Sequence, residues 1–457
     1  MGEGAWSDGL FEAGLGDPEV AALVGWPARV ARMVEVEAAL GRALAAAGVI
    51  SAAAADAIGD ACDLDRIDLE DLAARAARAA TPVIPLVQVL TEGADPVGAA
   101  WLHHGATSQD VVDTAVVLQV RDALDHLDAR LAETSHRCAM LAREHAATVM
   151  AGRTLGQPAV PITLGLKAAR WTAALDRRRE VFAWLRPRVL VVQLGGAAGT
   201  GAVWGEHGRG VAVGFADELG LGLPDLPWHA ERDRVADLAG ALAAVAGVVE
   251  HVATDLVLLA QAEIGEVREA AGDGPGSSAM PHKRNPVHAA AARAAARLAR
   301  GDCQVLADAA AGHEHERAAG AWQAEWVALP SALVRTAGAL RRLDAALAGL
   351  EVDEARMRHN LDANLGLTGS EALAAALTPL LGRRDAQALV GELARRAAEE
   401  SRSLHDIAGA DARVAAVLDT SVLTATLAPE AAVPGATGLV ERALAAHDQL
   451  VDRLGGT

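Results

Sequence analysis

The chain contains no tyrosine, and aromatic residues make up only 3% of its 457 positions. The hydrophobic fraction is nevertheless 52%, and much of it is alanine. Alanine is the best helix former and lets helices approach one another closely, so this composition favours packed helices over β-sheet. At this length, two or three domains are expected rather than one core.

Cysteine is also scarce. Cys62, Cys138 and Cys303 are far apart and form no CxxC pair or metal-binding spacing. This pattern favours reduced structural thiols in a cytoplasmic protein. The N-terminal sequence MGEGAWSDGL lacks the basic and apolar regions of a secretion signal. Apolar runs such as residues 252–262 are too short to span a bilayer, and this one includes Asp255. We therefore expect a soluble, cytoplasmic protein with no membrane partner.

Basic residues are outnumbered by acidic ones, and the formal net charge is -19. A nucleic-acid partner is not expected, because such proteins normally present a basic face. A few local cations can still dominate one cleft, so a site for a small anionic molecule remains open.

Long segments without glycine or proline predict long helices. In residues 110–150, apolar residues recur at alternating steps of three and four, which predicts a bundle helix of up to roughly 60 Å. The apolar positions of this seam are Val117, Val120, Leu124, Leu127, Leu131, Cys138 and Leu141, with polar Thr134 filling one step. Further long helices are expected at about 161–187, 229–271 and 287–350. The only strand-like run is VLVVQL at 189–194.

These patterns predict an all-α fold with three domains. Residues 1–109 form an N-terminal helical domain, residues 110–350 a central long-helix bundle, and residues 351–457 a small C-terminal helical domain. Helices of such length cannot bury their apolar stripes within a compact monomer, so we expect side-by-side packing that continues between subunits.

The segment GDGPGSSAMPHKRNP, at 272–286, interrupts the helical pattern with glycines and prolines and is predicted to be a loop. Asn285 followed by Pro286 is typical of a helix start, with Asn285 as the N-cap. The partial positive charge of that helix end, together with Lys283 and Arg284, would suit a carboxylate. The glycine-flanked serines would then fold over this anion as a lid. From the residues alone, a plain linker with solvated charges is the favoured interpretation, and an anion-binding lid is the alternative.

The motif GSSAMPHKRNP resembles the signature loop of the fumarase/aspartase superfamily, which includes class II fumarase and adenylosuccinate lyase. HHGATSQDVVDTA (103–115) and GRTLGQPAVPITLGLK (152–167) agree with it in order. TPVIPLVQVL (81–90) and GHEHERAAGAWQAEW (312–326) are similar to the bacterial 3-carboxy-cis,cis-muconate cycloisomerases in particular. The resemblance extends over nearly the whole chain.

The resemblance implies a cofactor-free intramolecular addition of a carboxylate to a C=C bond, which closes a lactone, with Ser277 as the proton-transfer group. A serine hydroxyl needs nearby cations or N–H groups to act in this way, and Lys283 and Asn285 are implied to supply them. The implied substrate contacts come from three further segments: His104, Thr107, Ser108, Thr154, Gln157 and Arg317. Structural alternatives remain open, since Thr107 and Ser108 also suit a helix cap, His104 a structural role, and Arg317 a surface salt bridge.

The run His313-Glu314-His315 resembles a metal-ligand cluster. If it lies on a helix, residues two apart point in different directions and cannot ligate together, so no metal is predicted.

Departures from the superfamily pattern narrow the range of reactions expected of this chain. Leu155 follows GRT where the lyases that act on adenylosuccinate and argininosuccinate have a catalytic histidine, and leucine cannot relay a proton. The segment TPVIPLVQ holds neither the histidine nor the aspartate of a second lyase pair. APEAAVPGATG lacks the tyrosine that the cycloisomerases tend to have near the C-terminus, which leaves fine substrate specificity open.

Three functions remain. The favoured one is a cycloisomerase acting on a muconate tricarboxylate in the protocatechuate branch of the β-ketoadipate pathway. A second is a superfamily lyase that eliminates across a C–N or C–O bond of a succinyl-type substrate and releases fumarate. A third is a non-catalytic scaffold, which the presence of Ser277, Lys283 and Asn285 disfavours. The resemblance also implies a homotetramer whose active sites are shared between subunits.

Overall fold

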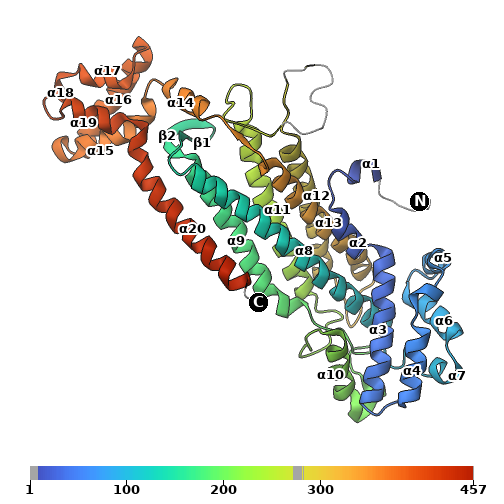
Figure 1. Ribbon diagram of the computed structural model, residues 1–457. Coiled ribbons are helices and arrows are strands. Elements are labelled where there is room, and N and C mark those ends of the chain that lie inside the picture. The colour runs from blue at the N-terminus through green and yellow to red at the C-terminus, as the bar shows by residue number, and fades with distance from the viewer. Residues whose placement is uncertain (1–8, 271–279, 281–282, 456–457) are drawn as a thin grey trace. The chain divides into compact units, whose positions relative to one another are not determined.

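The computed structural model describes residues 9–270, 280 and 283–455. Helices dominate these ranges, so the all-α prediction is confirmed (Figure 1). The chain divides into two compact units, described separately below. Unit 1 comprises residues 1–130, 178–249 and 291–341, and unit 2 comprises residues 131–177, 250–290 and 342–457.

Five long helices contribute residues to both units. They are α8 (Ser108–Glu144), α9 (Leu164–Val189), α11 (Asp233–Leu259), α12 (Val287–Ala311) and α13 (Ala321–Leu347). The seam predicted in α8 is confirmed, because all of its apolar positions except the half-buried Leu141 are buried, and Thr134 is buried as well.

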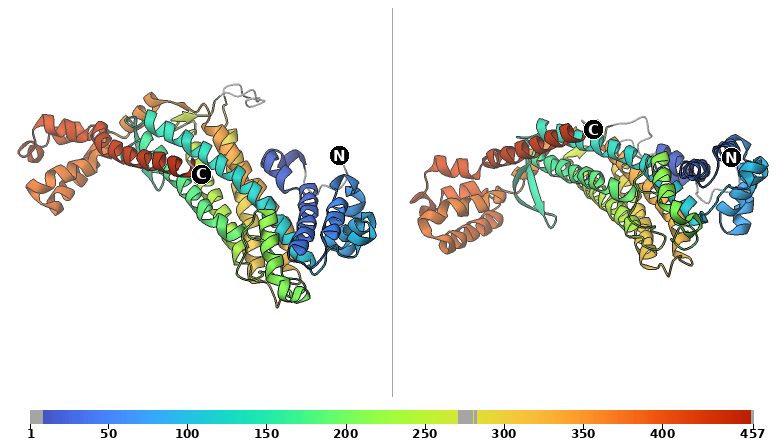
Figure 2. Two further views of the ribbon diagram at one scale, coloured as in Figure 1. Left: turned by 60° about the horizontal axis from the view of Figure 1, so that its bottom comes forward. Right: turned by 90° about the horizontal axis from the view of Figure 1, so that it is seen from below.

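The remaining helices of unit 1 are short, apart from α3. They are α1 (Gly9–Glu12), α2 (Pro18–Val24), α3 (Trp26–Ala46), α4 (Ala52–Ala61), α5 (Leu69–Ala79), α6 (Val83–Gly93), α7 (Pro96–Ala99), the 3-10 helix η2 (Ala202–His207) and α10 (Gly208–Leu219). Helix α3 packs against α4 and α10, and α4 packs against α7. In Figure 2, helices α1 to α7 are drawn in shades of blue and α10 in green.

Unit 2 combines two small antiparallel sheets with a helical C-terminal part. Strands β1 (Val149–Thr154) and β2 (Gln157–Thr163) form one sheet, and β3 (Val267–Arg268) and β4 (Glu351–Val352) form the other. The helices are α14 (Glu354–Asp362), α15 (Ser370–Leu381), α16 (Arg383–Glu400), α17 (Leu404–Gly409), α18 (Ala412–Ala415), α19 (Thr420–Leu427) and α20 (Val433–Gly455). Helices α15 to α19 gather around a common apolar core (Figure 1).

The strand-like run at 189–194 forms no strand, in keeping with the all-α prediction. Helix α9 continues to Val189, and Val191 forms only a single bridge, with Gly222. The strands lie instead at β1 and β2, where Leu155 (φ 51°) and Gly156 (φ 77°) form the two-residue turn. Two left-handed residues match the right-handed twist of a hairpin, which explains why the chain reverses here.

Two predicted helices are shorter than expected. The stretch 287–350 is divided at residues 312–320, where His315 (φ 48°) and Gly320 (φ 118°) adopt left-handed conformations that a helix does not allow. The stretch 229–271 ends as a helix at Leu259, and Gly265 (φ 62°) turns the chain toward β3.

Helix α11 is the one described helix that is long and apolar enough to cross a membrane by length and composition. Its most apolar window has a mean hydropathy of 1.8. Val245, Val249 and Val252 are nevertheless completely buried within the protein, as expected of a core helix in a bundle.

Candidate active site

The loop before α8 forms the N-terminal cap of that helix. The carbonyl oxygen of Thr107 accepts hydrogen bonds from the backbone N–H groups of Asp110 (3.0 Å) and Val111 (3.4 Å). In return, Oδ2 of Asp110 accepts from the backbone N–H of Thr107 at 3.0 Å. The bond from Thr107 N–H to Asp110 is one half of a capping box, so the helix-cap alternative for Thr107 is correct for its backbone. The Thr107 side chain is left free for other contacts.

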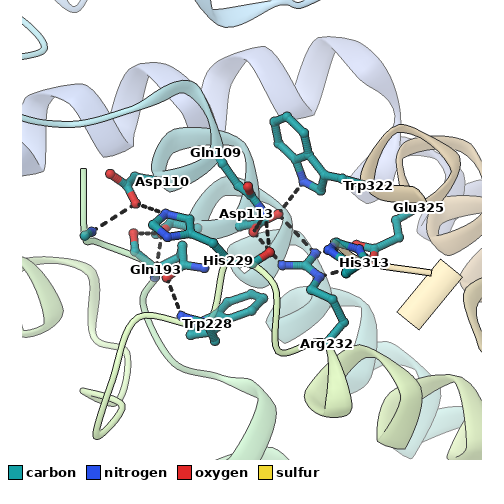
Figure 3. A network of polar contacts seen from close by, with 12 residues as sticks. Gln109, Asp110, Asp113, Gln193, Trp228, His229, Arg232, His313, Trp322 and Glu325 are labelled. Atoms are coloured by element: carbon teal, nitrogen blue, oxygen red, sulfur yellow. Dashed lines mark hydrogen bonds and ion pairs between the residues drawn. The ribbon is translucent and has the colours of Figure 1, made fainter. Parts of the chain in front are cut away.

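Asp110 also fixes a second loop beside Thr107. Its carboxylate accepts hydrogen bonds from the backbone N–H groups of Gly195 (3.0 Å) and Gly196 (2.9 Å), and Nε2 of His229 lies 2.7 Å from Oδ1. Asp110 is buried, so these contacts join the glycine-rich loop after α9 firmly to the start of α8 (Figure 3).

Arg317 reaches the same place from the turn between α12 and α13. Its guanidinium donates to Oγ1 of Thr107 at 2.9 Å and to the carbonyl oxygen of Ala197 at 3.0 Å. Both acceptors are neutral oxygens, so neither of these two contacts neutralises the guanidinium charge. The Arg317 side chain is exposed. A cation and a hydroxyl are thereby held side by side, which is an arrangement suited to a carboxylate.

A buried ion-pair network also involves the first turns of α8. Arg232 donates to Asp113 (2.6 and 3.2 Å) and to both carboxylate oxygens of Glu325. Burial would lower the pKa of Arg232, but the charges of Asp113 and Glu325 raise it above its usual range. The indole of Trp322 donates to Asp113 at 2.9 Å, and the amide of Gln109 donates to the same carboxylate at 3.1 Å (Figure 3). The network therefore links α8, α13 and the segment before α11 in unit 1.

His313 belongs to this network rather than to a metal site. Its Nε2 lies 3.3 Å from Oε1 of Glu325. The run from His313 to His315 lies between α12 and α13, outside any helix, so helix geometry does not apply to these residues as was assumed. Among the described residues, no group of three or more His, Cys, Asp or Glu side chains could hold a metal ion.

His104 is half-buried, and its described ring contact is with Trp101, at a centroid distance of 4.9 Å. Its carbonyl oxygen accepts from the indole N–H of Trp204 at 3.3 Å. Ser108 is the first residue of α8 and is half-buried. Both residues thus lie in the same loop region as Thr107.

Unit 2 carries the other predicted site residues. Thr154 and Gln157 face each other across the tip of the β1–β2 hairpin, and both are exposed. Between them, Leu155 is fully exposed. Next to this tip, Arg153 donates to both oxygens of the buried Glu266 at 2.9 and 2.7 Å.

Lys283 and Asn285 are exposed residues that precede α12. The predicted cap is wrong by one residue, because α12 begins at Val287 and the carbonyl of Pro286 accepts from Ala290 N–H at 3.0 Å. The carboxylate of Glu269 accepts from the first N–H groups of the helix, those of His288 (3.0 Å) and Ala289 (2.8 Å). An internal carboxylate therefore fills the position predicted for a substrate anion. Ser277 lies outside the described residues.

Arg284 forms a second set of hydrogen bonds in this segment. Its guanidinium donates to the carbonyl oxygen of Glu269 at 2.8 Å and to both carboxylate oxygens of Glu351 at 2.9 and 2.8 Å. The residue that was expected to attract a substrate anion is therefore already paired.

Comparison with known proteins identifies the family of the chain. A family model described as a lyase matches residues 26–301. The chain belongs to this lyase family, a branch of the fumarase/aspartase superfamily. The resemblance inferred from the motifs is confirmed.

Two curated relatives cover almost all of this lyase. The 3-carboxy-cis,cis-muconate cycloisomerase of Pseudomonas aeruginosa is 44% identical over 96% of the chain and 97% of its own length. The nitrosuccinate lyase of Streptomyces davaonensis is 41% identical over 97% of the chain and 96% of its own length. Among solved structures, the 3-carboxy-cis,cis-muconate lactonizing enzyme from Pseudomonas putida matches with a TM-score of 0.90 and 40% identity, covering 97% of this chain and 100% of that one.

Sequence reasoning missed the residues that organise the site in unit 1. Asp110, Asp113 and Glu325 are buried acids, and Arg232 is the buried counter-ion of Asp113 and Glu325. Two acids three residues apart within DVVDT lie on one face of a helix, and here that face is buried. A buried acid requires a hydrogen-bond or charge partner, so this spacing could have identified both acids as structural residues.

Proposed function

We propose that this lyase-family member is a 3-carboxy-cis,cis-muconate cycloisomerase that forms 4-carboxymuconolactone in the protocatechuate branch of the β-ketoadipate pathway. The observation that carries the proposal is the contact between Arg317 and Thr107, which builds a carboxylate-binding pair beside the start of α8. The choice of reaction is supported by the cycloisomerase relatives and by Leu155, which cannot serve as the proton relay of the histidine-bearing lyases.

In the proposed reaction, one substrate carboxylate oxygen forms a bond to an alkene carbon. The π electron pair moves toward a second carboxylate and gives an aci-carboxylate, and the carbon beside that carboxylate then takes up a proton. One carboxylate charge is consumed and one proton is added. No metal and no cofactor enters these steps.

Roles are proposed for the residues as follows. Ser277 delivers the proton, and Lys283 and Asn285 stabilise its oxyanion. Thr107 and Arg317 bind one carboxylate, with Ser108 and His104 beside it, and Thr154 and Gln157 bind the remainder of the substrate. Replacement of Ser277 by alanine should leave folding intact and remove most turnover, whereas activity near the wild-type level would reject its role.

The nitrosuccinate lyase relative supports a second candidate, a β-elimination that releases fumarate. The two candidates are separated by ultraviolet spectroscopy of the purified protein. With 3-carboxy-cis,cis-muconate, the cycloisomerase should remove the conjugated-diene absorbance as the lactone forms. Appearance of fumarate absorbance from nitrosuccinate, with the muconate spectrum unchanged, would establish the lyase and reject the favoured function.

The proposal includes the assembly and the location of the enzyme. We propose a cytoplasmic homotetramer whose long helices pack between subunits and whose active sites combine segments of different chains. Large apolar side chains such as Val327, Val305 and Leu298 are exposed on the long helices of the single chain, which supports such packing. The three domains 1–109, 110–350 and 351–457 remain the proposed division.

A further inference from the structure

His103 adopts an unusual backbone conformation directly before the Thr107 loop. Its φ angle is 60°, in the left-handed region that residues other than glycine rarely adopt. Such conformations persist where the surroundings hold the residue in place, and they concentrate at functional sites. The side chain is 21% exposed, so the ring is accessible to a ligand.

The residue that holds His103 is Glu37, on α3. Oε1 of Glu37 lies 2.6 Å from Nδ1 of the imidazole, and the Glu37 side chain is completely buried. Oε2 of Glu37 has no hydrogen-bond partner among the described residues. A carboxylate this deeply buried is stable as an anion only beside a compensating cation. An ion pair with a protonated imidazole satisfies that requirement.

The ionisable groups around the pair favour the charged imidazole. Burial would lower the pKa of His103, but the hydrogen bond and the charge of Glu37, with a contribution from Asp110 on α8, raise it above its usual value. Near Glu37, burial raises the pKa of the Cys62 thiol to about 12, so this thiol stays neutral at physiological pH. Arg42 is paired with Glu218 on α10.

We propose that Glu37 holds His103 as an imidazolium cation beside the Thr107 loop, and that this cation binds a carboxylate of the substrate. His103 is then a substrate-binding residue and Glu37 a positioning residue that acts through it. The inference rests on the proposed function for the identity of the substrate, but only on the binding of a polycarboxylate for its test.

The test measures binding of an inert tricarboxylate, tricarballylate, by isothermal titration calorimetry between about pH 6 and 9. Wild-type protein should bind well at low pH. Its affinity should fall as the pH rises through the pKa of His103, because the imidazolium loses its charge there. In Glu37→Gln the buried carboxylate charge is gone, so the pKa of His103 falls and the loss of affinity should move to lower pH.

Two substitutions of His103 distinguish charge from structure. His103→Gln removes the charge and should weaken tricarballylate binding by about 10- to 100-fold at pH 6, the loss expected for one charge-assisted hydrogen bond. His103→Lys keeps a cation and should recover part of the affinity. Glu35→Gln is the matched control, because Glu35 lies on the same helix, is partly exposed and pairs with Arg32. It should leave both the affinity and its pH dependence unchanged.

Wild-type affinity in His103→Gln, or an unchanged pH dependence in folded Glu37→Gln, would overturn the inference. Absence of tricarballylate binding by the wild type at pH 6 would overturn it as well. If Glu37→Gln fails to fold, the comparison of His103→Gln with His103→Lys decides alone. Failure of the proposed function is seen separately, as an unchanged 3-carboxymuconate spectrum in wild-type protein that still binds tricarballylate through His103.

Discussion

Arg317 and Thr107 are 210 positions apart in the chain and are joined by one hydrogen bond. We expect Arg317→Met to raise KM for the muconate about 10- to 100-fold, because a charge-assisted hydrogen bond contributes roughly 1.5–3 kcal/mol. The fold should be unaffected, since the side chain is exposed. Steady-state kinetics check the effect, with Arg66→Met as a control on another exposed arginine. An unchanged KM would show that Arg317 binds no substrate carboxylate.

The sequence motifs identified the candidate substrate-binding residues, but not the side chains that position them. Thr107 and Arg317 were identified by resemblance, and the structure places them in contact. Asp110, which accepts hydrogen bonds from Thr107, Gly195 and Gly196, was missed. A sequence pattern shows that an acid lies near a helix start, but its partners come from distant segments and depend on the tertiary fold.

At the scale of single elements, the start of α12 depends on Glu269. We expect Glu269→Ala to destabilise this helix end by about 0.5–2 kcal/mol, the usual cost of losing a cap. The local consequence should be faster hydrogen exchange at the amides of His288 and Ala289, which donate to this carboxylate. Activity should fall with it, because Lys283 and Asn285 directly precede the helix.

Glu263→Gln provides the control for that measurement, since Glu263 is an exposed acid in the same segment of unit 2. It should leave the exchange of both amides unchanged. Slow exchange at His288 and Ala289 in Glu269→Ala would contradict the capping role.

The buried network around Arg232 makes a second prediction at this scale. Arg232→Met leaves Asp113 and Glu325 without their shared cation, and removal of one partner from a buried ion pair typically costs about 3–5 kcal/mol. Urea denaturation at a fixed protein concentration measures the loss, because the stability of an oligomer depends on concentration. Arg188→Met is the control, since Arg188 pairs with Asp237 at an exposed position and should cost less than about 1 kcal/mol. Equal losses of unfolding free energy in the two variants would show that the buried network stabilises the fold no more than an exposed ion pair does.

Helix content was predictable because apolar periodicity is local to the chain. The seam from Val117 to Cys138 is buried as its spacing predicted. The interruptions of the predicted helices were harder to predict, because they depend on single left-handed residues such as His315 and Gly265. Whether such a residue ends a helix depends on the tertiary fold.

At the scale of the whole molecule, the long helices require partners. The exposed apolar side chains of α12 and α13 favour association between subunits. The homotetramer proposed from the family resemblance would appear in sedimentation equilibrium of the purified protein as a single species of four times the chain mass. Val327→Asp places a charge on such a surface and should shift the protein toward smaller species with lower activity. A fully active monomer would contradict shared active sites.

The central claim is that ring closure is coupled to proton uptake at the carbon beside a carboxylate. Proton NMR of the product formed from 3-carboxy-cis,cis-muconate in D₂O tests it most directly. The account predicts a carboxymuconolactone that carries one deuterium at that carbon. Recovery of unchanged diene, or of a lactone with no deuterium there, would contradict it.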